Sequence, residues 1–138
     1  MKWAIYARTA QVDERSVSEQ EKCARQALKK NDEVAGVYTD NGYSGVGLNR
    51  PALKQLLKDA KEGKFQGVII SRIDRLGRSC ANVRHLLQQL ERDNIVFKSA
   101  TEPYDTSQPV EKLSFALMTA FADYERQMRY ERRMEKLI

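Results

Sequence analysis

The chain has 138 residues, which is enough for one domain with its own core, and we see no internal repeat, linker or low-complexity tract. Its 24 Lys and Arg residues outnumber 19 Asp and Glu residues, giving a net charge of +5 and a pI of about 9.3 that favour a polyanionic partner. The small number of cysteines (two) and histidines (one) argues against structural zinc and histidine catalysis. The sequence has no apolar run of membrane length and no signal-like N-terminus, which argues against membrane insertion. We therefore expect a reduced, cytoplasmic protein without metal or cofactor.

The N-terminal segment predicts one strand and one helix. The short apolar run 3–7 is typical of a buried strand, and the polar residues 12–15 predict a loop. Ser16 or Ser18 is expected to cap the helix, because the sequence SEQE that begins at Ser18 has the form of a capping box. We expect this helix to run to about Lys30.

A second strand and helix follow. Residues 34–38 predict the strand, and residues 39–47, rich in glycine and small polar residues, predict a loop. The glycines of this loop lack the spacing of either common nucleotide-binding motif, so they are only weakly typical of a nucleotide site. Pro51 suits a first helical position, and the helix is expected to end at Gly63. Its apolar residues recur at helical spacing: Ala52, Leu53, Leu56, Leu57 and Ala60.

The central stretch 68–79 changes abruptly from apolar to charged. Residues 68–70 form an unbroken apolar run, as in a strand that is covered on both faces. Ligands of open α/β sheets bind where the strands end, and the arginine fork matches phosphate. The alternative is an ordinary solvated loop. The charged residues of this stretch are Arg72, Asp74, Arg75 and Arg78.

The next residues predict one more helix and strand. A helix is expected from about Cys80, with His85 on the surface beside its apolar stripe. Residues 95–97 predict the fourth strand, and residues 102–109 a polar loop. Strands that alternate with helices predict a single α/β domain with a parallel sheet.

The last segment, residues 110–138, predicts a long helix. At 1.5 Å per residue it would be roughly 40 Å long, more than a small domain needs to cover its sheet. Its first half is expected to pack on the domain or on a second subunit, through Leu113, Leu117, Ala120, Phe121, Tyr124 and Met128. Its second half is expected to project. The arginines there either follow a phosphate backbone or form a solvated helix end with Glu–Arg pairs: Arg126, Arg129, Arg132 and Arg133.

Taken together, these segments resemble the catalytic domain of the serine recombinases, the family of resolvases, invertases and large serine integrases. The resemblance runs from about residue 3 to residue 133. It implies a resolvase-like parallel sheet with flanking helices, and a C-terminal helix that forms a homodimer and reaches over DNA. It also implies metal-free DNA cleavage through a 5′-phosphoserine link, subunit rotation in a tetramer, and religation. The matching motifs are Tyr6-Ala7-Arg8, Ser18-Glu19-Gln20, Asp40-Asn41-Gly42-Tyr43-Ser44-Gly45, Arg50-Pro51, Ile73-Asp74-Arg75-Leu76-Gly77-Arg78, Asp105-Thr106 and Glu125-Arg126.

The resemblance also implies roles for individual residues. Four arginines would bind and stabilise the scissile phosphate, Asp74 would orient an arginine or assist proton transfer, and Gln20 matches a glutamine near the active site. Breaking a phosphodiester without a metal requires another source of positive charge, which arginines supply. The four arginines are Arg8, Arg50, Arg75 and Arg78.

The position of the nucleophilic serine holds Ala10, which has no hydroxyl and cannot attack phosphorus. The hydroxyls nearby belong to Thr9, Ser16 and Ser18. Thr9 is expected to point to the opposite face of its strand, and Ser18 is better suited to capping. The alanine is either a deliberate replacement or the mark of a natural non-cleaving relative. In both cases we expect DNA binding without cleavage.

Two other functions remain open, and the DNA target is unknown. The chain is either a non-catalytic DNA-binding and dimerisation module or, less in keeping with the motifs, a binder of small phosphate ligands. The sequence contains neither a helix-turn-helix nor a zinc module. The DNA-recognition domain of this family is therefore expected to lie outside the chain.

Overall fold

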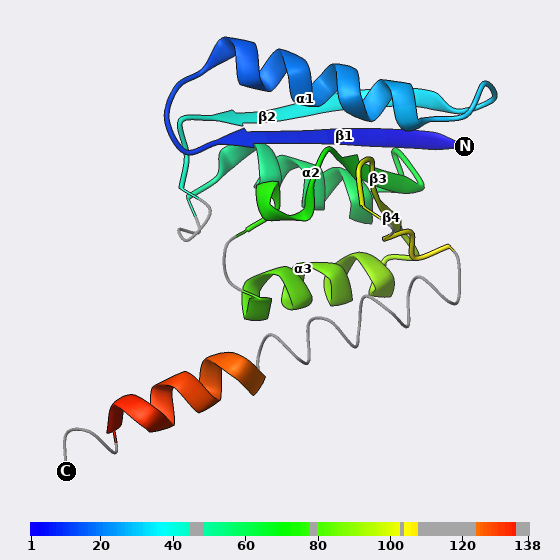
Figure 1. Cartoon of the computed structure of the whole chain (residues 1–138). Helices are drawn as coiled ribbons and strands as arrows, with labels where there is room; N and C mark the ends of the chain where they lie inside the picture. Colours follow the sequence, from blue (N-terminus) through cyan, green and yellow to red (C-terminus); the bar gives the residue numbers. More distant parts are fainter. Residues whose placement is uncertain (45–48, 78–79, 103, 108–123, 135–138) are drawn as a thin grey trace.

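The structure is a computed structural model that describes residues 1–44, 49–77, 80–102, 104–107 and 124–134. Strands and helices alternate along the chain, and the predicted α/β fold with a parallel sheet is confirmed (Figure 1). The elements are β1 (Lys2–Thr9), α1 (Glu14–Ala27), β2 (Glu33–Asn41), α2 (Pro51–Lys61), β3 (Gly67–Ile70), the 3-10 turn η1 (Ile73–Arg75), α3 (Cys80–Arg92) and β4 (Val96–Ser99).

The four strands lie in the order β2-β1-β3-β4, and every neighbouring pair is parallel. The pairing of β1 with β3 ends at Tyr6 and Ile70, whereas the pairing of β1 with β2 continues to Thr9 and Asn41. The two longer strands therefore outrun β3 at the carboxyl edge of the sheet. The charged turn η1 follows β3 directly at this edge.

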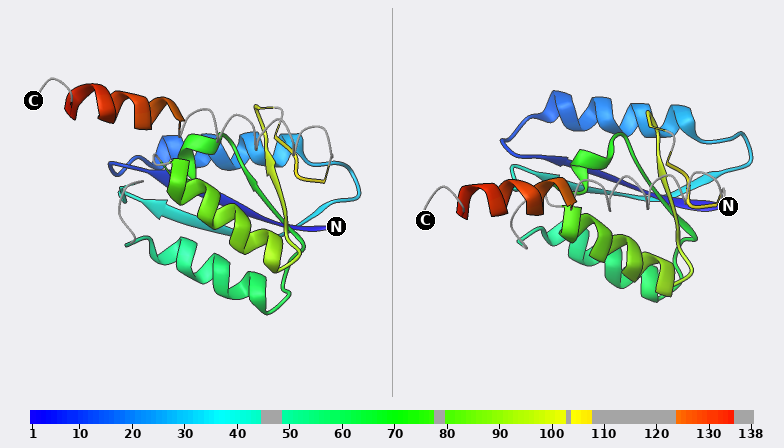
Figure 2. Two further views of the ribbon diagram at one scale, coloured as in Figure 1. Left: turned by 90° about the horizontal axis from the view of Figure 1, so that it is seen from below. Right: turned by 60° about the horizontal axis from the view of Figure 1, so that its bottom comes forward.

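Helices cover both faces of the sheet (Figures 1 and 2). Helix α1 lies on one face, while α2 and α3 share the other. Alternate residues of β1 enter the two cores, because successive side chains of a strand point to opposite faces. The larger core contains Tyr6, Leu56, Phe65, Ile70, Leu90 and Phe97, and the smaller one Trp3, Ile5, Ala24 and Ile69.

Several boundaries differ from the sequence prediction. Helix α1 begins at Glu14, because the Asp13 carboxylate accepts the Ser16 amide at 3.1 Å and caps the helix. The predicted loop over 12–15 is therefore correct only for residues 12 and 13, and the predicted cap at Ser16 or Ser18 and helix end near Lys30 were wrong. Residues 39–41, predicted as loop, belong to β2, and β4 covers 96–99 instead of 95–97. In each case hydrogen bonds set the boundary, and these do not show in apolar spacing.

The C-terminal helical segment, residues 124–134, is the described part of the predicted long helix. It lies beyond the N-terminal end of α3, on the side of the molecule where β1 and β2 end (Figures 1 and 2). The remainder of the predicted helix, residues 110–123 and 135–138, lies outside the described residues. Among the helices that the structure describes, none combines the length and the apolar composition that a membrane crossing requires.

Candidate active site

Arg8, near the end of β1, is only 3% exposed, and its guanidinium group points at the backbone around η1. Its Nε donates to the carbonyl oxygen of Arg75 at 2.9 Å, and its Nη2 donates to that of Asp74 at 3.1 Å. Its Nη1 donates to the carbonyl oxygen of Tyr43 at 3.0 Å. One buried arginine thus joins the end of β1 to the loops that follow β2 and β3.

Arg50 brings a second buried guanidinium group to the same place. It precedes α2, is 3% exposed and donates through Nη1 to the carbonyl oxygen of Leu76. Its Nε is buried and has no hydrogen-bond partner. A buried charged donor without a partner is costly, so this atom is prepared to receive an acceptor.

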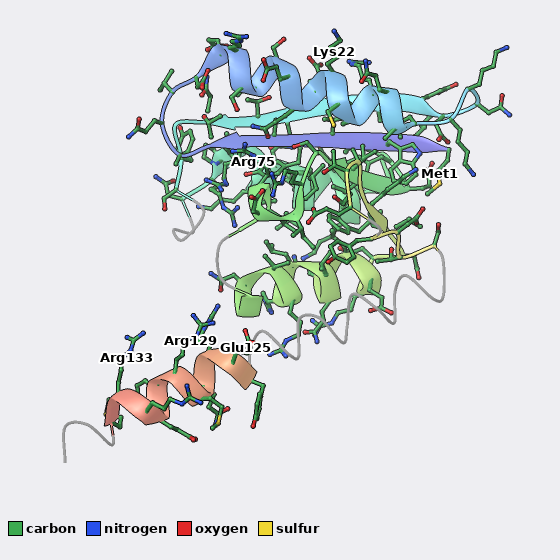
Figure 3. All side chains as sticks on the ribbon, in the orientation of Figure 1. Met1, Lys22, Arg75, Glu125, Arg129 and Arg133 are labelled. Carbon is green, nitrogen blue, oxygen red and sulfur yellow. The ribbon has the colours of Figure 1, made fainter. Side chains whose placement is uncertain are left out.

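The turn η1 carries the charged residues of the central stretch. Asp74 has a side chain that is 59% exposed, and its carboxylate lies 3.9 Å from the Nε of Arg72 and 3.9 Å from that of Arg75. Such long, solvated ion pairs contribute little stability. The Nε of Arg75 is buried and lacks a hydrogen-bond partner, and Figure 3 shows this residue below β1 at the sheet. Arg78 lies outside the described residues.

Gln20 is a buried residue of α1 that binds the backbone of Arg8. Arg8 lies beyond the last residue of β1 that pairs with β3, Tyr6. Its Oε1 accepts the Arg8 amide at 3.1 Å, and its Nε2 donates to the Arg8 carbonyl oxygen at 3.1 Å. The side-chain amide therefore takes the place of the missing strand neighbour. Gln20 fixes the backbone two residues before position 10.

The loop at position 10 is held by Asn41 at the end of β2. The Asn41 Oδ1 accepts the Thr9 hydroxyl at 2.6 Å and the Asp13 amide at 2.8 Å. Thr9 is buried, and its Oγ1 also accepts the Gly42 amide at 3.1 Å, so its hydroxyl is occupied. Ala10 is exposed between these anchors. This role of Asn41 was not predicted from the sequence, although an asparagine beside a glycine at a strand end is a typical turn signal.

Asp40 is fully buried and organises the start of α2. Its carboxylate accepts the amides of Ala52 at 2.8 Å and Leu53 at 3.0 Å, and the Tyr6 hydroxyl at 2.7 Å. Burial, and then the bond to Asp40, raise the pKa of Tyr6 above its ordinary range. No role for Asp40 was predicted from the sequence, although a helix that begins Arg50-Pro51 without Ser, Thr, Asp or Asn needs a cap from elsewhere.

The arginines of the C-terminal helical segment are exposed: Arg126, Arg129, Arg132 and Arg133. Arg129 pairs with Glu125 at 3.7 Å, one helical turn away, which is the kind of pair that the alternative interpretation expected. Figure 3 shows Arg129 and Arg133 on this segment, apart from Arg75. Of the expected dimer residues, Tyr124 is 61% exposed, whereas Leu113, Leu117 and Phe121 lie outside the described residues.

The structure thus brings Arg8 and Arg50 together on the backbone of residues 74–76, the segment to which Arg75 belongs. Position 10 follows Arg8 after one residue, Thr9, which ends β1 at the same edge of the sheet. Their binding to a single phosphate remains a prediction. Within the described residues, no cluster of His, Cys, Asp and Glu is suited to hold a metal ion.

Comparisons with known proteins show the family of the chain. Residues 3–137 match the family described as "Resolvase, N terminal domain". The serine recombinase gin of Escherichia phage Mu is 37% identical over 98 residues, which is 71% of this chain and 50% of that protein. A putative DNA recombinase of Bacillus subtilis is 33% identical over 129 residues, 89% of this chain and 25% of that protein.

Among solved structures, the N-terminal catalytic domain of TP901-1 integrase superimposes with a TM-score of 0.83 at 31% identity, covering 94% of this chain and all of that one. The chain spans about half the length of the phage Mu relative and 25% of the length of the Bacillus subtilis relative. The fold, the arginines at the carboxyl edge and the family match lead to one conclusion: the chain belongs to the family of resolvase N-terminal domains, the catalytic domains of serine recombinases.

Proposed function

We propose that this chain is the catalytic domain of a site-specific DNA recombinase and that, with Ala10 in the nucleophile's place, it binds DNA without cutting it. One observation carries the proposal. Two buried guanidinium groups, those of Arg8 and Arg50, come from different segments and meet at the turn that carries Arg75, beside position 10. Positive charge gathered in this way suits a phosphodiester.

The reaction of the family needs little from the protein beyond a nucleophile, positioning and positive charge. A serine oxygen at position 10 would attack the scissile phosphorus and break its bond to the 3′ oxygen. The products are a 5′-phosphoserine and a 3′-hydroxyl, and the reverse attack by a 3′-hydroxyl reseals the strand. Arg8, Arg50 and Arg75 would stabilise the charge that develops on phosphate.

The guanidinium groups already hold carbonyl oxygens of the surrounding loops. In the proposed function these carbonyls stand in for phosphate oxygens while DNA is absent. When phosphate binds, its oxygens replace the carbonyl oxygens as the acceptors of the guanidinium groups. The Nε atoms of Arg50 and Arg75 have no hydrogen-bond partner, and Arg75 makes only a long 3.9 Å ion pair with Asp74, so neither atom has to give up a hydrogen bond before it donates to phosphate.

Ala10 removes the reacting atom, and the described hydroxyls nearby do not replace it. The Thr9 hydroxyl is buried and bonded to Asn41, and Ser16 Oγ accepts from Gln20 at 3.2 Å. Ser18 is exposed within α1. This favours the interpretation that the chain, with its present sequence, is a non-catalytic DNA-binding module. With serine at position 10, the same site would cleave DNA.

The test restores the nucleophile. The chain and its Ala10→Ser variant are incubated with a library of labelled random-sequence duplexes, because the target is unknown, and denatured protein is examined for bound label. We expect a 5′-linked adduct with Ala10→Ser, and none with the unaltered chain or with the Ala10→Ser, Arg75→Ala double variant. An adduct formed by the unaltered chain, or none by an Ala10→Ser protein that binds the library, overturns the proposal.

A further inference from the structure

Two helical starts at the carboxyl edge of the sheet lack a cap of their own. Arg50 stands at the N-cap of α2 and Arg72 at the N-cap of η1, and neither side chain accepts an amide. Ser, Thr, Asp or Asn normally fills this position and satisfies the orphan amides of the first turn. In both places a carboxylate from a distant segment does so instead: Asp40 for α2 and Glu102 for η1.

Glu102 lies in the loop after β4, and its Oε1 accepts the Ile73 amide at 2.6 Å. The same oxygen accepts the Ser99 hydroxyl at 2.9 Å, which holds the carboxylate in place. One residue earlier, Thr101 binds the Ser71 carbonyl oxygen through its amide at 3.2 Å and through its hydroxyl at 2.7 Å. The loop after β4 is thereby tied to the start of the turn.

The opposite side of the turn is held by the arginines. Arg8 takes the carbonyl oxygens of Asp74 and Arg75, and Arg50 takes that of Leu76. Glu102 therefore holds the start of the turn through the Ile73 amide, while the arginines hold its end through carbonyl oxygens. A turn of three residues has few hydrogen bonds of its own, so loss of one outside anchor affects the whole segment.

We infer that Glu102 is a positioning residue that sets the geometry of η1, and with it the direction of Arg75 toward the phosphate. The inference rests on the proposed function for the role of Arg75. Glu102 itself touches neither the nucleophile's position nor the arginine side chains in the described contacts. It acts through the backbone of Ile73.

Duplex binding separates this role from simple electrostatics. Removing a carboxylate near bound DNA raises affinity if only charge matters, so Glu102→Ala and Glu102→Gln would both bind a short duplex more tightly at low salt. A positioning role predicts the opposite for alanine. Glu102→Ala should bind about two- to tenfold more weakly, the range that one hydrogen bond is worth, whereas Glu102→Gln keeps an acceptor for Ile73 and should not lose affinity.

Glu102→Asp keeps the charge but shortens the side chain, so it should also bind duplex more weakly. It replaces Glu102→Ala in this test if the alanine variant fails to fold. The Arg75→Ala, Glu102→Ala double variant should bind no more weakly than Arg75→Ala alone, because both changes remove the same interaction. Thr101→Val removes one of the two bonds from Thr101 to the Ser71 carbonyl oxygen and keeps the amide bond, so it should weaken binding less than Glu102→Ala does. Additive losses, or weaker binding by Glu102→Gln equal to that of Glu102→Ala, would overturn the inference.

Hydrogen exchange of the Ile73 amide tests the positioning step without DNA. Glu102→Ala should speed this exchange about tenfold or more relative to the unaltered chain, while amides of β1 stay protected and Thr101→Val has a smaller effect. Unchanged exchange at Ile73 would overturn the inference by itself. If Arg75→Ala leaves duplex affinity unaltered, the proposed function fails instead, and exchange still decides whether Glu102 holds the turn.

Discussion

Asp40 shows how much one buried carboxylate does at this site. It receives two amides from the first turn of α2 and the hydroxyl of Tyr6 from the middle of the sheet. Arg50 immediately precedes that turn, so its direction depends on the same anchor. A carboxylate in a dry environment is stable there because each of these donors faces it.

Replacing this anchor should cost stability in proportion to the donors left without a partner. We expect Asp40→Ala to lower the free energy of unfolding by about 2–4 kcal/mol, since it leaves two amides and one hydroxyl unsatisfied. Tyr6→Phe removes only one of the three bonds and should cost about 1 kcal/mol. Urea unfolding of both variants measures the difference. Equal losses would mean that the cap of α2 contributes nothing.

At the scale of the elements, β2 and α2 are joined by Asp59, a buried residue of α2. Its carboxylate accepts the Tyr38 hydroxyl at 2.5 Å, the Gln55 amide at 2.9 Å and the Lys64 ammonium at 3.1 Å. The bond from Tyr38, followed by those from Lys64 and Gln55, holds the pKa of Asp59 below its ordinary value of 3.8.

This lowered pKa makes stability depend on acid. The folded state binds the Asp59 proton less readily than the unfolded state, so the contribution of Asp59 is present above pH 3.8 and is lost as pH falls through its lower folded-state value. Urea unfolding between pH 6 and pH 2, in steps of about one unit, should therefore show a smaller acid loss for Asp59→Asn than for the unaltered chain. An unchanged loss would contradict the assignment. The pKa of Asp32 is lowered by the Lys29 amide, so Asp32 should make its own contribution to the acid loss of stability in both proteins.

The sequence predicted the kind and order of these elements, because apolar spacing reports which faces are buried. The unbroken run at 68–70 and the stripe of α2 led to the correct strand and helix. The start of α1 was missed because Asp13, not a serine, supplies the cap. The site arginines came from the family resemblance. Their anchors Asp40, Asn41 and Glu102 were missed, since each acts on a segment far away in sequence.

At the scale of the whole molecule, positive charge stands both at the carboxyl edge of the sheet and on the C-terminal helical segment. The net charge of +5 predicts that duplex DNA is bound without sequence preference and with strong dependence on salt. The C-terminal helical segment, which carries Arg129 and Arg133, lies on the side of the molecule where β1 and β2 end (Figures 1 and 3). We therefore expect one duplex to contact both this segment and the edge of the sheet.

The salt dependence should reveal which arginines meet phosphate. Removing one arginine that binds a phosphate should lower the slope of log affinity against log salt by about one. We expect this for Arg129→Ala and for Arg133→Ala, measured by fluorescence anisotropy on a short duplex. Arg25→Ala, a change at the end of α1 where that arginine pairs with Glu21, is the matched control and should leave the slope unaltered. A change in the control alone would place the DNA elsewhere.

The C-terminal stripe should also govern assembly. Phe121 belongs to the apolar stripe of the sequence, whose described members are the exposed Tyr124 and the half-buried Met128, and an apolar stripe that reaches the surface calls for a partner. We expect ultracentrifugation to show a dimer at high concentration that Phe121→Glu abolishes. Tyr130→Glu, which places the same charge on the exposed Tyr130 off the stripe, should keep the dimer. A folded Phe121→Glu protein that still dimerises would exclude this helix from the interface.

The distant cap of η1 has a consequence for biosynthesis. Synthesis from the N-terminus delivers β1, β3 and the arginines to solvent long before residue 102 leaves the ribosome. A nascent or truncated chain that stops after β4 contains Arg8, Arg50 and Arg75 but no acceptor for the Ile73 amide. In a relative with serine at position 10, an unfinished polypeptide would therefore hold its charges without their final alignment. The order of translation itself would then delay strand breakage until the domain is nearly complete.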